Sequence, residues 1–299
     1  KLVDDQVKQV IRDCIPLGPL HNPANLMGIE VCQDLFPGTP NVAVFDTQFG
    51  MSMPPESYMY GLPYEYYEDL HIRRYGFHGT SHTYVSKKTA EFLHKPLSET
   101  NCIVMHLGNG SSLSCTKNGK CLDTSMGLTP LEGMIMGTRC GTLDPAIVPF
   151  IMKKKGFTPE EMDTLMNKKS GLQALCGSAD MRDVHKEREN GNKRAELAFR
   201  MLVHGIKKIL GSYFFLLGGK VDAVTFTAGI GEHDELVRAA VMEGLEGIGF
   251  KLDPEANRAR KSGARAISAP DSRIPILVIP TNEELQIAET AVEVVSKIK

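Results

Sequence analysis

The chain alternates short apolar runs with longer segments in which apolar residues recur every three or four positions. The first pattern is typical of buried strands and the second of amphipathic helices. Residues 22–36 have helical spacing after an Asn-Pro start signal and before Pro37-Gly38, so they predict a helix. Residues 41–46 form the next apolar run, which predicts a buried strand with Asp46 at its carboxyl end.

Three consecutive strands are predicted in the middle of the chain, at residues 103–105, at residues 112–116 and after Asn118-Gly119. Asn-Gly between two extended runs is a strong signal for a two-residue hairpin turn. These strands are therefore expected to form an antiparallel meander.

A long amphipathic helix is predicted over residues 191–217, with an apolar side formed by Ala195, Ala198, Leu202, Ile206 and Ile209. Two strand-turn-helix units follow it. In the first, residues 221–226 lead through a glycine turn to a helix from Asp234, and in the second, residues 276–279 lead to Thr281. Hairpins mixed with strand-turn-helix units predict an α/β fold.

Composition narrows the class of protein. The 299 residues are 42% hydrophobic with a formal charge of −2, which is typical of a soluble globular chain. We see no basic stripe for nucleic acid, no signal peptide and no apolar run near the roughly 20 residues that a membrane span needs. We therefore expect a cytoplasmic protein without a nucleic-acid or membrane partner. The seven cysteines are scattered without a C-x-x-C pair, so they are predicted to be reduced thiols.

Four glycine-punctuated polar loops stand close to apolar runs, at residues 75–82, 106–112, 137–145 and 227–232. The first contains two histidines and two hydroxyl side chains in a turn broken by glycine. Four such loops in one chain indicate one anion site built from several loops rather than four unrelated turns.

The same loops carry a resemblance. Arg-Tyr-Gly-Phe-His-Gly-Thr-Ser-His at residues 74–82, Phe-Thr-Ala-Gly-Ile-Gly-Glu at 226–232 and Pro-Thr-Asn-Glu-Glu at 280–284 stand in the order found in acetate kinases. The chain resembles that family from residue 19 to residue 284. The resemblance implies the ribonuclease H-like fold of the acetate and sugar kinases, actin and the heat-shock chaperone ATPases, with two related domains around a cleft.

By this resemblance, residues 1–48 and 281–299 are expected to belong to the first domain and residues 49–280 to the second, nucleotide-binding domain. Matching begins well inside the family's usual sequence. We therefore expect the first domain to be incomplete here, without an N-terminal segment that carries a phosphate loop and a substrate-binding arginine.

The function that the resemblance implies is reversible, direct phosphoryl transfer between ATP and acetate, giving acetyl phosphate and ADP, with Mg²⁺ (or Mn²⁺) as cofactor. The alternatives are a propionate or butyrate kinase of the same family, and a nucleotide-binding scaffold without catalysis. Family habit and the apolar side of the helix at residues 191–217 favour a homodimer.

Asp46 and His78 are the first two catalytic candidates. Asp46 follows an apolar run, where an aspartate often caps the next turn, but the resemblance makes it the catalytic carboxylate that acts on the metal. His78 lies between glycines. His82 follows four positions later, which leaves metal ligation open. The glutamate of H-E-x-x-H is absent, however, and Thr80-Ser81 is the expected cap of the following helix. The resemblance makes His78 a donor to the phosphoryl group in flight.

Arg139 is the third catalytic candidate, in a loop between Gly137 and Gly141. A surface salt bridge is one interpretation. The planar guanidinium also matches phosphoryl oxygens with two parallel hydrogen bonds, and the resemblance implies that use.

The turn around Asn109 either closes a hairpin or cradles phosphate with its amides, and the resemblance favours phosphate. The residues expected to bind nucleotide or phosphate are His106, Gly108, Asn109, Gly110, Asp180, Met181, Arg182, Gly229, Ile230 and Gly231. The residues expected to bind the acceptor are Leu20, His21, Phe77 and Pro130.

Thr281-Asn-Glu-Glu284 matches a capping box, with Thr281 as the N-cap and Glu284 reaching back to it. This interpretation explains Glu284 and leaves Glu283 free. By resemblance, Glu283 is a carboxylate of the magnesium site, consistent with a cation that is held by few carboxylates together with water and phosphate.

Overall fold

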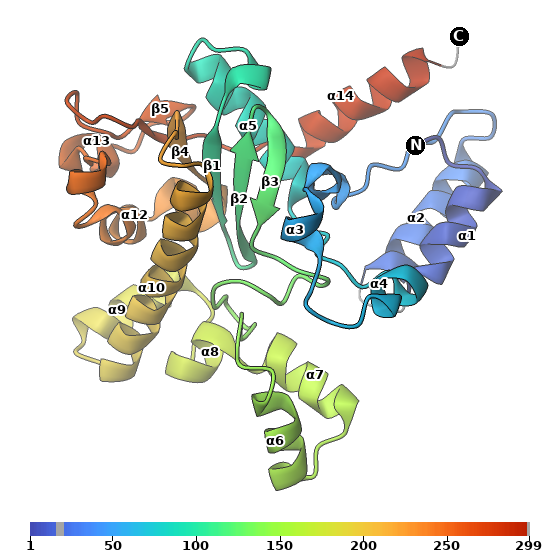
Figure 1. Ribbon diagram of the computed structural model, residues 1–299, viewed down its shortest axis with the longest axis horizontal. Helices are drawn as coiled ribbons and strands as arrows, with labels where there is room; N and C mark the ends of the chain where they lie inside the picture. Colours follow the sequence, from blue (N-terminus) through green and yellow to red (C-terminus); the bar gives the residue numbers. More distant parts are fainter. Residues whose placement is uncertain (16–20, 298–299) are drawn as a thin grey trace.

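The computed structural model describes residues 1–15 and 21–297 of the chain. Within these residues a six-stranded mixed sheet forms the centre, in the order β3-β2-β1-β4-β6-β5 (Figure 1). The strands are β1 (Cys102–Leu107), β2 (Ser111–Lys117), β3 (Lys120–Thr124), β4 (Ala223–Thr227), β5 (Arg265–Ala266) and β6 (Ile276–Val278). The central strands β1, β4 and β6 run parallel, and the outer strands pair antiparallel with their neighbours.

The predicted meander is confirmed. Strands β1, β2 and β3 pair in sequence, and the turn between β2 and β3 is Asn118-Gly119. Both turn residues have positive φ, 51° at Asn118 and 73° at Gly119, as a tight hairpin turn of this type requires.

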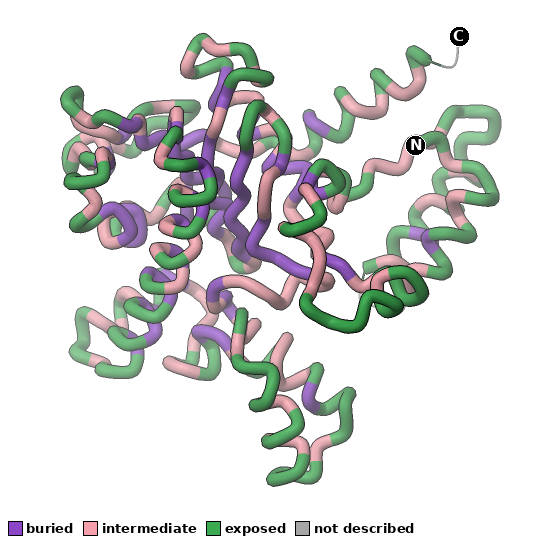
Figure 2. Tube along the Cα trace, in the orientation of Figure 1, coloured by how far each residue is buried: buried purple, intermediate pink, exposed green. Residues whose placement is uncertain are grey.

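Two helices cover the two faces of the sheet, α10 (Lys193–Leu216) on one and α5 (Gly79–Phe92) on the other. Alternate residues of β1 follow this division, because Ile103 and Met105 belong to the core around α10, whereas Val104 packs with Val85 of α5. The buried part of the trace is concentrated in the strands (Figure 2). The fold is therefore α/β, as predicted.

The long helix is confirmed, but its apolar side packs into the core of the same chain, whereas it was expected to favour a homodimer. Ala195, Ala198, Leu202 and Ile206 are buried in the core of the same chain. The apolar side is thus occupied within the chain and gives no support to a homodimer. The homodimer stays a prediction that depends on the resemblance alone.

The prediction of a buried strand at residues 41–46 is wrong. Val42 forms one isolated bridge with Leu2, and the segment is otherwise extended and half-buried, with Phe45 38% exposed. A strand needs a neighbouring backbone along its whole length, and the described residues offer this one bridge. The segment places Asp46 at the start of α5, as described below.

The remaining helices surround this centre. They are α1 (Asp5–Asp13), α2 (Asn22–Leu35), η2 (Gln48–Ser52), α3 (Pro55–Tyr58), α4 (Glu65–Leu70), η3 (Leu97–Glu99), α6 (Ile147–Lys155), α7 (Pro159–Lys168), α8 (Gly171–Cys176), α9 (Met181–Glu189), α11 (Ala228–His233), α12 (Glu235–Met242), η4 (Glu246–Ile248), α13 (Pro254–Arg258) and α14 (Glu283–Ser296). The helix predicted from residue 22 is confirmed as α2. The glycine turn predicted after residue 226 is instead the short helix α11.

The structure bears on two expectations from composition, on the cysteines and on membrane-spanning helices. All seven cysteines are free. Among the described helices, none has the length and apolar character needed to cross a membrane.

The capping box predicted at the last helix is wrong. Asn282, not Thr281, is the N-cap of α14, and its side chain accepts a hydrogen bond from the Leu285 amide at 3.0 Å. The Thr281 hydroxyl instead lies 2.8 Å from the Ser81 hydroxyl of α5. Thr281 is therefore drawn toward α5, and the next residue takes over the cap.

We predict that Asn282→Ala lowers the free energy of unfolding by about 1 kcal/mol, because it removes the side-chain acceptor from the first turn of α14. Glu284→Ala is the matched control, since Glu284 is exposed and takes no part in the cap. Denaturant melts of both variants measure the difference. Equal stability of the two variants would contradict the assignment of the cap.

Candidate active site

Functional side chains gather where the parallel strands β1, β4 and β6 end and α5 begins. His106 lies near the end of β1, Thr227 ends β4, and Thr281 follows β6. Ligands commonly bind at the carboxyl ends of parallel strands in α/β sheets. This edge of the sheet is the candidate site.

Asp46 caps the start of α5. Its carboxylate accepts hydrogen bonds from the amides of His78 at 2.6 Å and Thr80 at 3.1 Å, and its carbonyl oxygen accepts from the Gly79 amide at 3.0 Å. A negative charge at a helix N-terminus is favourable. The expectation that Thr80-Ser81 caps this helix is therefore wrong, because a carboxylate 32 residues away from His78 supplies the cap.

His78 is held at the entrance of α5 in the left-handed region, with φ 56°. A residue other than glycine rarely adopts this conformation, and when it does, the site is often functional. The imidazole stacks on that of His106 with 4.1 Å between ring centroids. Burial lowers the pKa of His78, an effect that nearby Asp46 opposes and Arg139 reinforces.

The two other histidines of the site are also held neutral. Burial, followed by the charge of His78, lowers the pKa of His106 to about 3. Burial lowers the pKa of His82 well below its ordinary value, with smaller contributions from His106 and His78.

Metal ligation by His78 and His82 is not supported. Both ring nitrogens of His82 lie within hydrogen-bond distance of serine hydroxyls, 2.7 Å from Ser112 and 2.8 Å from Ser114. Within the part of the chain that the structure describes, no group of three or more His, Cys, Asp or Glu residues is placed to hold a metal.

Arg139 and His78 converge on Gly110. A Cβ atom at Gly110 would lie 3.3 Å from Nη1 of Arg139 and 3.4 Å from Nε2 of His78. Nη1 of Arg139 also donates to the carbonyl oxygen of Pro130 at 3.0 Å. Among the described residues Arg139 forms no ion pair, so the surface salt bridge considered for it is absent.

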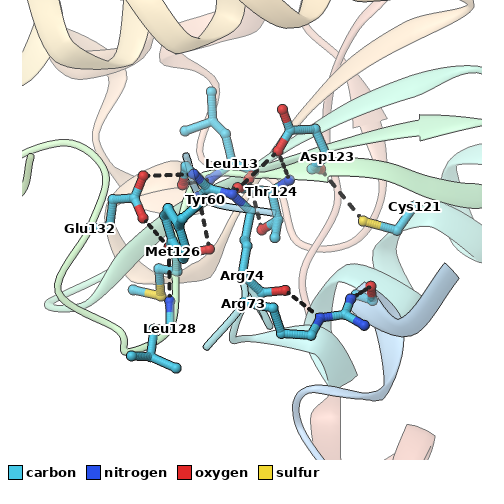
Figure 3. A network of polar contacts seen from close by, with 12 residues as sticks. Tyr60, Arg73, Arg74, Leu113, Cys121, Asp123, Thr124, Met126, Leu128 and Glu132 are labelled. Atoms are coloured by element: carbon cyan, nitrogen blue, oxygen red, sulfur yellow. Dashed lines mark hydrogen bonds and ion pairs between the residues drawn. The ribbon is translucent and has the colours of Figure 1, made fainter. Parts of the chain in front are cut away.

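A part-buried polar network around Arg74, Tyr60 and Glu132 joins loops of the site (Figure 3). Arg74, four residues before His78, pairs with Glu132 at 2.7 Å and donates to the carbonyl oxygens of Thr124 and Met126. The Tyr60 hydroxyl donates to the same Glu132 at 2.7 Å. The network therefore connects the segment before His78 with the loop that contains Pro130.

The Tyr60 hydroxyl belongs to this network as a neutral group. Burial, and then the hydrogen bond to Glu132, raise the pKa of Tyr60 to about 12. The hydroxyl of Tyr60 therefore keeps its proton at neutral pH and remains a donor to Glu132.

A cavity of about 1430 Å³ lies beside Gly110, since Gly108 and Asn109 line it. Most of the residues expected to bind nucleotide line it, namely Gly108, Asn109, Asp180, Met181, Arg182, Gly229 and Ile230. Gly231 does not line it, because it is buried against Met105 and Phe226 of the sheet. The cavity and the donors share the loop from His106 to Gly110.

Asp180 and Arg182 lie at this cavity but pair with one another. The carboxylate of Asp180 accepts from the Arg182 backbone amide at 2.9 Å, as the N-cap of α9, and from its guanidinium. These hydrogen bonds to Arg182 lower the pKa of Asp180 to about 2. Met181 is buried in the core around α10 and also reaches the cavity.

Sequence analysis missed a basic part of the cavity lining. It contains the basic residues Arg258, Arg260, Lys261 and Arg265. Their clustering within eight residues of the sequence was the available signal. Arg238 is also unpredicted. Its buried guanidinium donates to the carbonyl oxygen of Gly231 at 3.0 Å and to Asn257 at 2.7 Å, and it gave no signal because it occupies an ordinary helical position.

The residues expected to bind the acceptor are only partly brought together. Pro130 contacts Arg139 through its carbonyl, and Phe77 is half-buried directly before His78. His21 is exposed at the N-cap of α2, without a side-chain capping bond. Leu20 lies outside the described residues.

Glu283 is half-buried in the first turn of α14. Burial, followed by the charge of Asp46, raises the pKa of Glu283. The two carboxylates therefore lie close enough to repel one another, which favours a cation beside them.

Comparisons with known proteins agree with this geometry. Residues 1–289 match the model of the acetokinase family. A relative from Desulfovibrio desulfuricans, named acetate kinase, is 71% identical over 296 residues, covering 99% of this chain and 73% of the relative. One from Nitratidesulfovibrio vulgaris, also named acetate kinase, is 61% identical over 292 residues, covering 98% of this chain and 72% of the relative.

Solved structures give the same result. The crystal structure of Porphyromonas gingivalis acetate kinase matches with a TM-score of 0.94 at 41% identity, covering 99% of this chain and 74% of that one. A propionate kinase from Francisella tularensis matches with a TM-score of 0.91 at 43% identity, covering 96% and 73%.

These matches, on this α/β fold, define the class of protein as a phosphotransferase with a carboxyl group as acceptor. The chain belongs to the acetokinase family. The predicted family and enzyme class, acetate kinase, are confirmed.

We predict that Gly110→Ala lowers kcat by roughly a hundredfold, because the added methyl group enters the space between Arg139 and His78 and displaces both donors. Gly211→Ala in α10 is the control, since its Cβ meets no atom within 4 Å. Steady-state kinetics and melting curves of both variants are the measurements. A Gly110→Ala enzyme with full kcat would show that the space between the donors is not used.

Proposed function

We propose that the chain transfers the γ-phosphoryl group of ATP in line to acetate, reversibly, giving acetyl phosphate and ADP. The observation that carries this proposal is the convergence of Arg139 and His78 on Gly110, next to the cavity that Gly108 and Asn109 line. Phosphoryl transfer needs donors aimed at the equatorial oxygens of the transferring group, and little covalent chemistry from the protein.

Arg139 and His78 act as those donors. The guanidinium offers two parallel N–H groups to the phosphoryl oxygens, and the neutral imidazole offers one N–H without adding a charge. Both groups are held before the reaction, Arg139 by the Pro130 carbonyl and His78 by its stacking on His106. Donors fixed in advance stabilise the charge that develops in the transition state.

Asp46 and Glu283 fit a magnesium ion. Burial, followed by the charge of Asp46, raises the pKa of Glu283, so the two carboxylates lie near one another. Two carboxylates, completed by water and phosphate oxygens, are a usual magnesium environment. When bound, Mg²⁺ (or Mn²⁺) neutralises phosphate charge. Asp46, the proposed catalytic carboxylate, keeps free lone pairs for this role although it caps α5.

The nucleotide occupies the cavity of about 1430 Å³. The loop from His106 to Gly110 lies on its phosphate side, and Gly229 and Ile230 lie on its adenosine side. Basic residues that also line the cavity, such as Arg260 and Lys261, balance the charge of the phosphates.

Acetate is the acceptor that we favour, and Phe77 and Pro130, next to His78 and Arg139 respectively, are the described residues that we propose to bind it. A propionate kinase is the second candidate, because the solved structure of one matches this chain as closely as that of an acetate kinase. Butyrate, and a scaffold without catalysis, are the remaining alternatives.

We further infer the architecture of two related domains around a cleft, as in the actin-like ATPases. Residues 1–48 and 281–299 belong to the first domain and residues 49–280 to the second. The contact between the Ser81 and Thr281 hydroxyls, at 2.8 Å, lies near this boundary and supports a site formed between the two parts. A homodimer remains part of the proposal and is tested by light scattering.

Rates of ATP-dependent phosphorylation of acetate, propionate and butyrate by the full-length protein test the proposal. We expect acetyl phosphate to form with the highest kcat/KM. A higher kcat/KM for propionate or butyrate would reassign the acceptor, and nucleotide binding without turnover on any of the three would indicate the scaffold.

We predict that Arg139→Ala lowers kcat about a hundredfold or more with little change in the affinity for ATP, because the guanidinium acts mainly in the transition state. Arg139→Lys is expected to restore activity only partly, since the planar pair of donors is lost. Steady-state kinetics and ATP titrations give both quantities. An unchanged kcat with a raised KM would show that Arg139 does not stabilise the transition state.

We predict that Glu283→Ala raises the magnesium concentration needed for the half-maximal rate, because one of two facing carboxylates is removed. The control is Glu284→Ala, its exposed neighbour in the same helical turn. Magnesium titrations of both variants measure the effect. The assignment is reversed if Glu284→Ala shifts the magnesium dependence and Glu283→Ala does not.

A further inference from the structure

A buried chain of hydroxyl and imidazole groups leads to His78 from inside the protein. It begins at Ser114, whose Oγ lies 2.8 Å from Nδ1 of His82. Nε2 of His82 lies 2.7 Å from Oγ of Ser112, and the same Oγ lies 2.9 Å from Nδ1 of His78. Ser112, Ser114 and His82 are all 0% exposed. Four side chains from β2 and α5 are thus connected in one line.

The direction of the chain follows from its inner end. Among the described residues, the His82 ring is the one hydrogen-bond partner of the Ser114 hydroxyl. A hydroxyl carries one proton and two acceptor lone pairs. If Ser114 accepted from His82, its own proton would be buried without an acceptor, whereas a spare lone pair is better tolerated. The Ser114 hydroxyl therefore donates to Nδ1 of His82.

The positions of the protons on His82, Ser112 and His78 then follow in turn. His82 is neutral, because burial lowers its pKa well below the ordinary value. A neutral imidazole that accepts at Nδ1 carries its proton on Nε2. That proton is donated to Ser112, and the single proton of Ser112 is left for Nδ1 of His78. His78, accepting at Nδ1, carries its own proton on Nε2, the atom that faces Gly110 and Arg139.

We propose that Ser114, His82 and Ser112 form a directional hydrogen-bond chain that fixes His78 as the Nε2–H tautomer. These three are positioning residues, since they reach the reacting phosphoryl group only through His78. The proposal rests on the donor role given to His78 above. The other tautomer would present a lone pair to the phosphoryl oxygens and repel them.

Histidine tautomers are measured directly by long-range ¹H–¹⁵N correlation spectra of the chain labelled at histidine, with His78→Gln and His82→Gln variants to assign the signals. We expect both imidazoles to be neutral and protonated at Nε2 near neutral pH. A His78 ring protonated mainly at Nδ1 would overturn the chain, whatever the catalytic activity. The tautomers are read from the unaltered chain, and the two variants serve only to assign the signals.

Ser112→Ala and Ser114→Ala test the consequence. Each is expected to give His78 a mixture of tautomers and to lower kcat roughly tenfold or more, with KM for ATP changed by less than about twofold, since a wrong histidine tautomer costs an enzyme up to about 10⁴ in rate. Thr116→Val is the matched control, because Thr116 is equally buried on the same face of β2 but contacts Ser86 instead.

The outcomes separate this inference from the proposed function. A tautomer mixture in Ser112→Ala with full kcat would leave the chain standing and refute the donor role of His78. Unchanged tautomers in both serine variants would refute the chain itself, and the same loss of kcat in Thr116→Val would show that the serines act only through packing.

Discussion

The carboxylate of Asp46 at the N-terminus of α5 is the interaction on which the site depends. It binds the amides of His78 and Thr80 and thereby sets the point at which the helix starts. That start places His78 in a left-handed conformation with its ring against His106. The helix dipole and the Asp46 carboxylate thus hold together two segments that share no strand, and His78 lies where they meet.

The layer between α5 and the sheet is polar, although it is buried. Ser112, Ser114 and Thr116 alternate on the α5 side of β2, and Thr89 of α5 meets Thr225 of β4 at 2.9 Å. An apolar layer would bury the strands at lower cost. Hydroxyl groups, however, give the histidines hydrogen-bond partners of defined geometry. The one hydroxyl of the described residues left without a partner in this region is that of Thr227.

Local signals in the sequence predicted much of the fold. The Asn118-Gly119 turn, the long helix and the helix after residue 22 were found because turn chemistry and helical spacing act over a few residues. The errors concern distant partners. Thr281 fits a local capping box, but the Ser81 hydroxyl competes for it from 200 residues away. Asp46 caps a helix that its own neighbourhood does not contain.

The candidate site shows the same division. His78, Arg139 and the loop from His106 to Gly110 were recognisable as polar groups among glycines, and the structure brings them together. The glutamates at residues 132 and 232 were not, because their roles depend on Arg74 and on the amides of Ala228 and Thr281. The alternation of serines on β2 was visible in the sequence, but only the packing of α5 against β2 shows that these serines contact His78 and His82.

The order of the strands also has a consequence for how the chain folds. The meander of β1, β2 and β3 closes over short turns, so its contacts cost little loop entropy, whereas β4 joins β1 only after the chain has passed from residue 124 to residue 223. His78 and His82 shortly precede β1 in the sequence and contact Ser112 of β2. We therefore expect the groups around His78 to assemble from nearby residues, and the residues after β4 that line the cavity to join them only with the slowest contacts of the sheet.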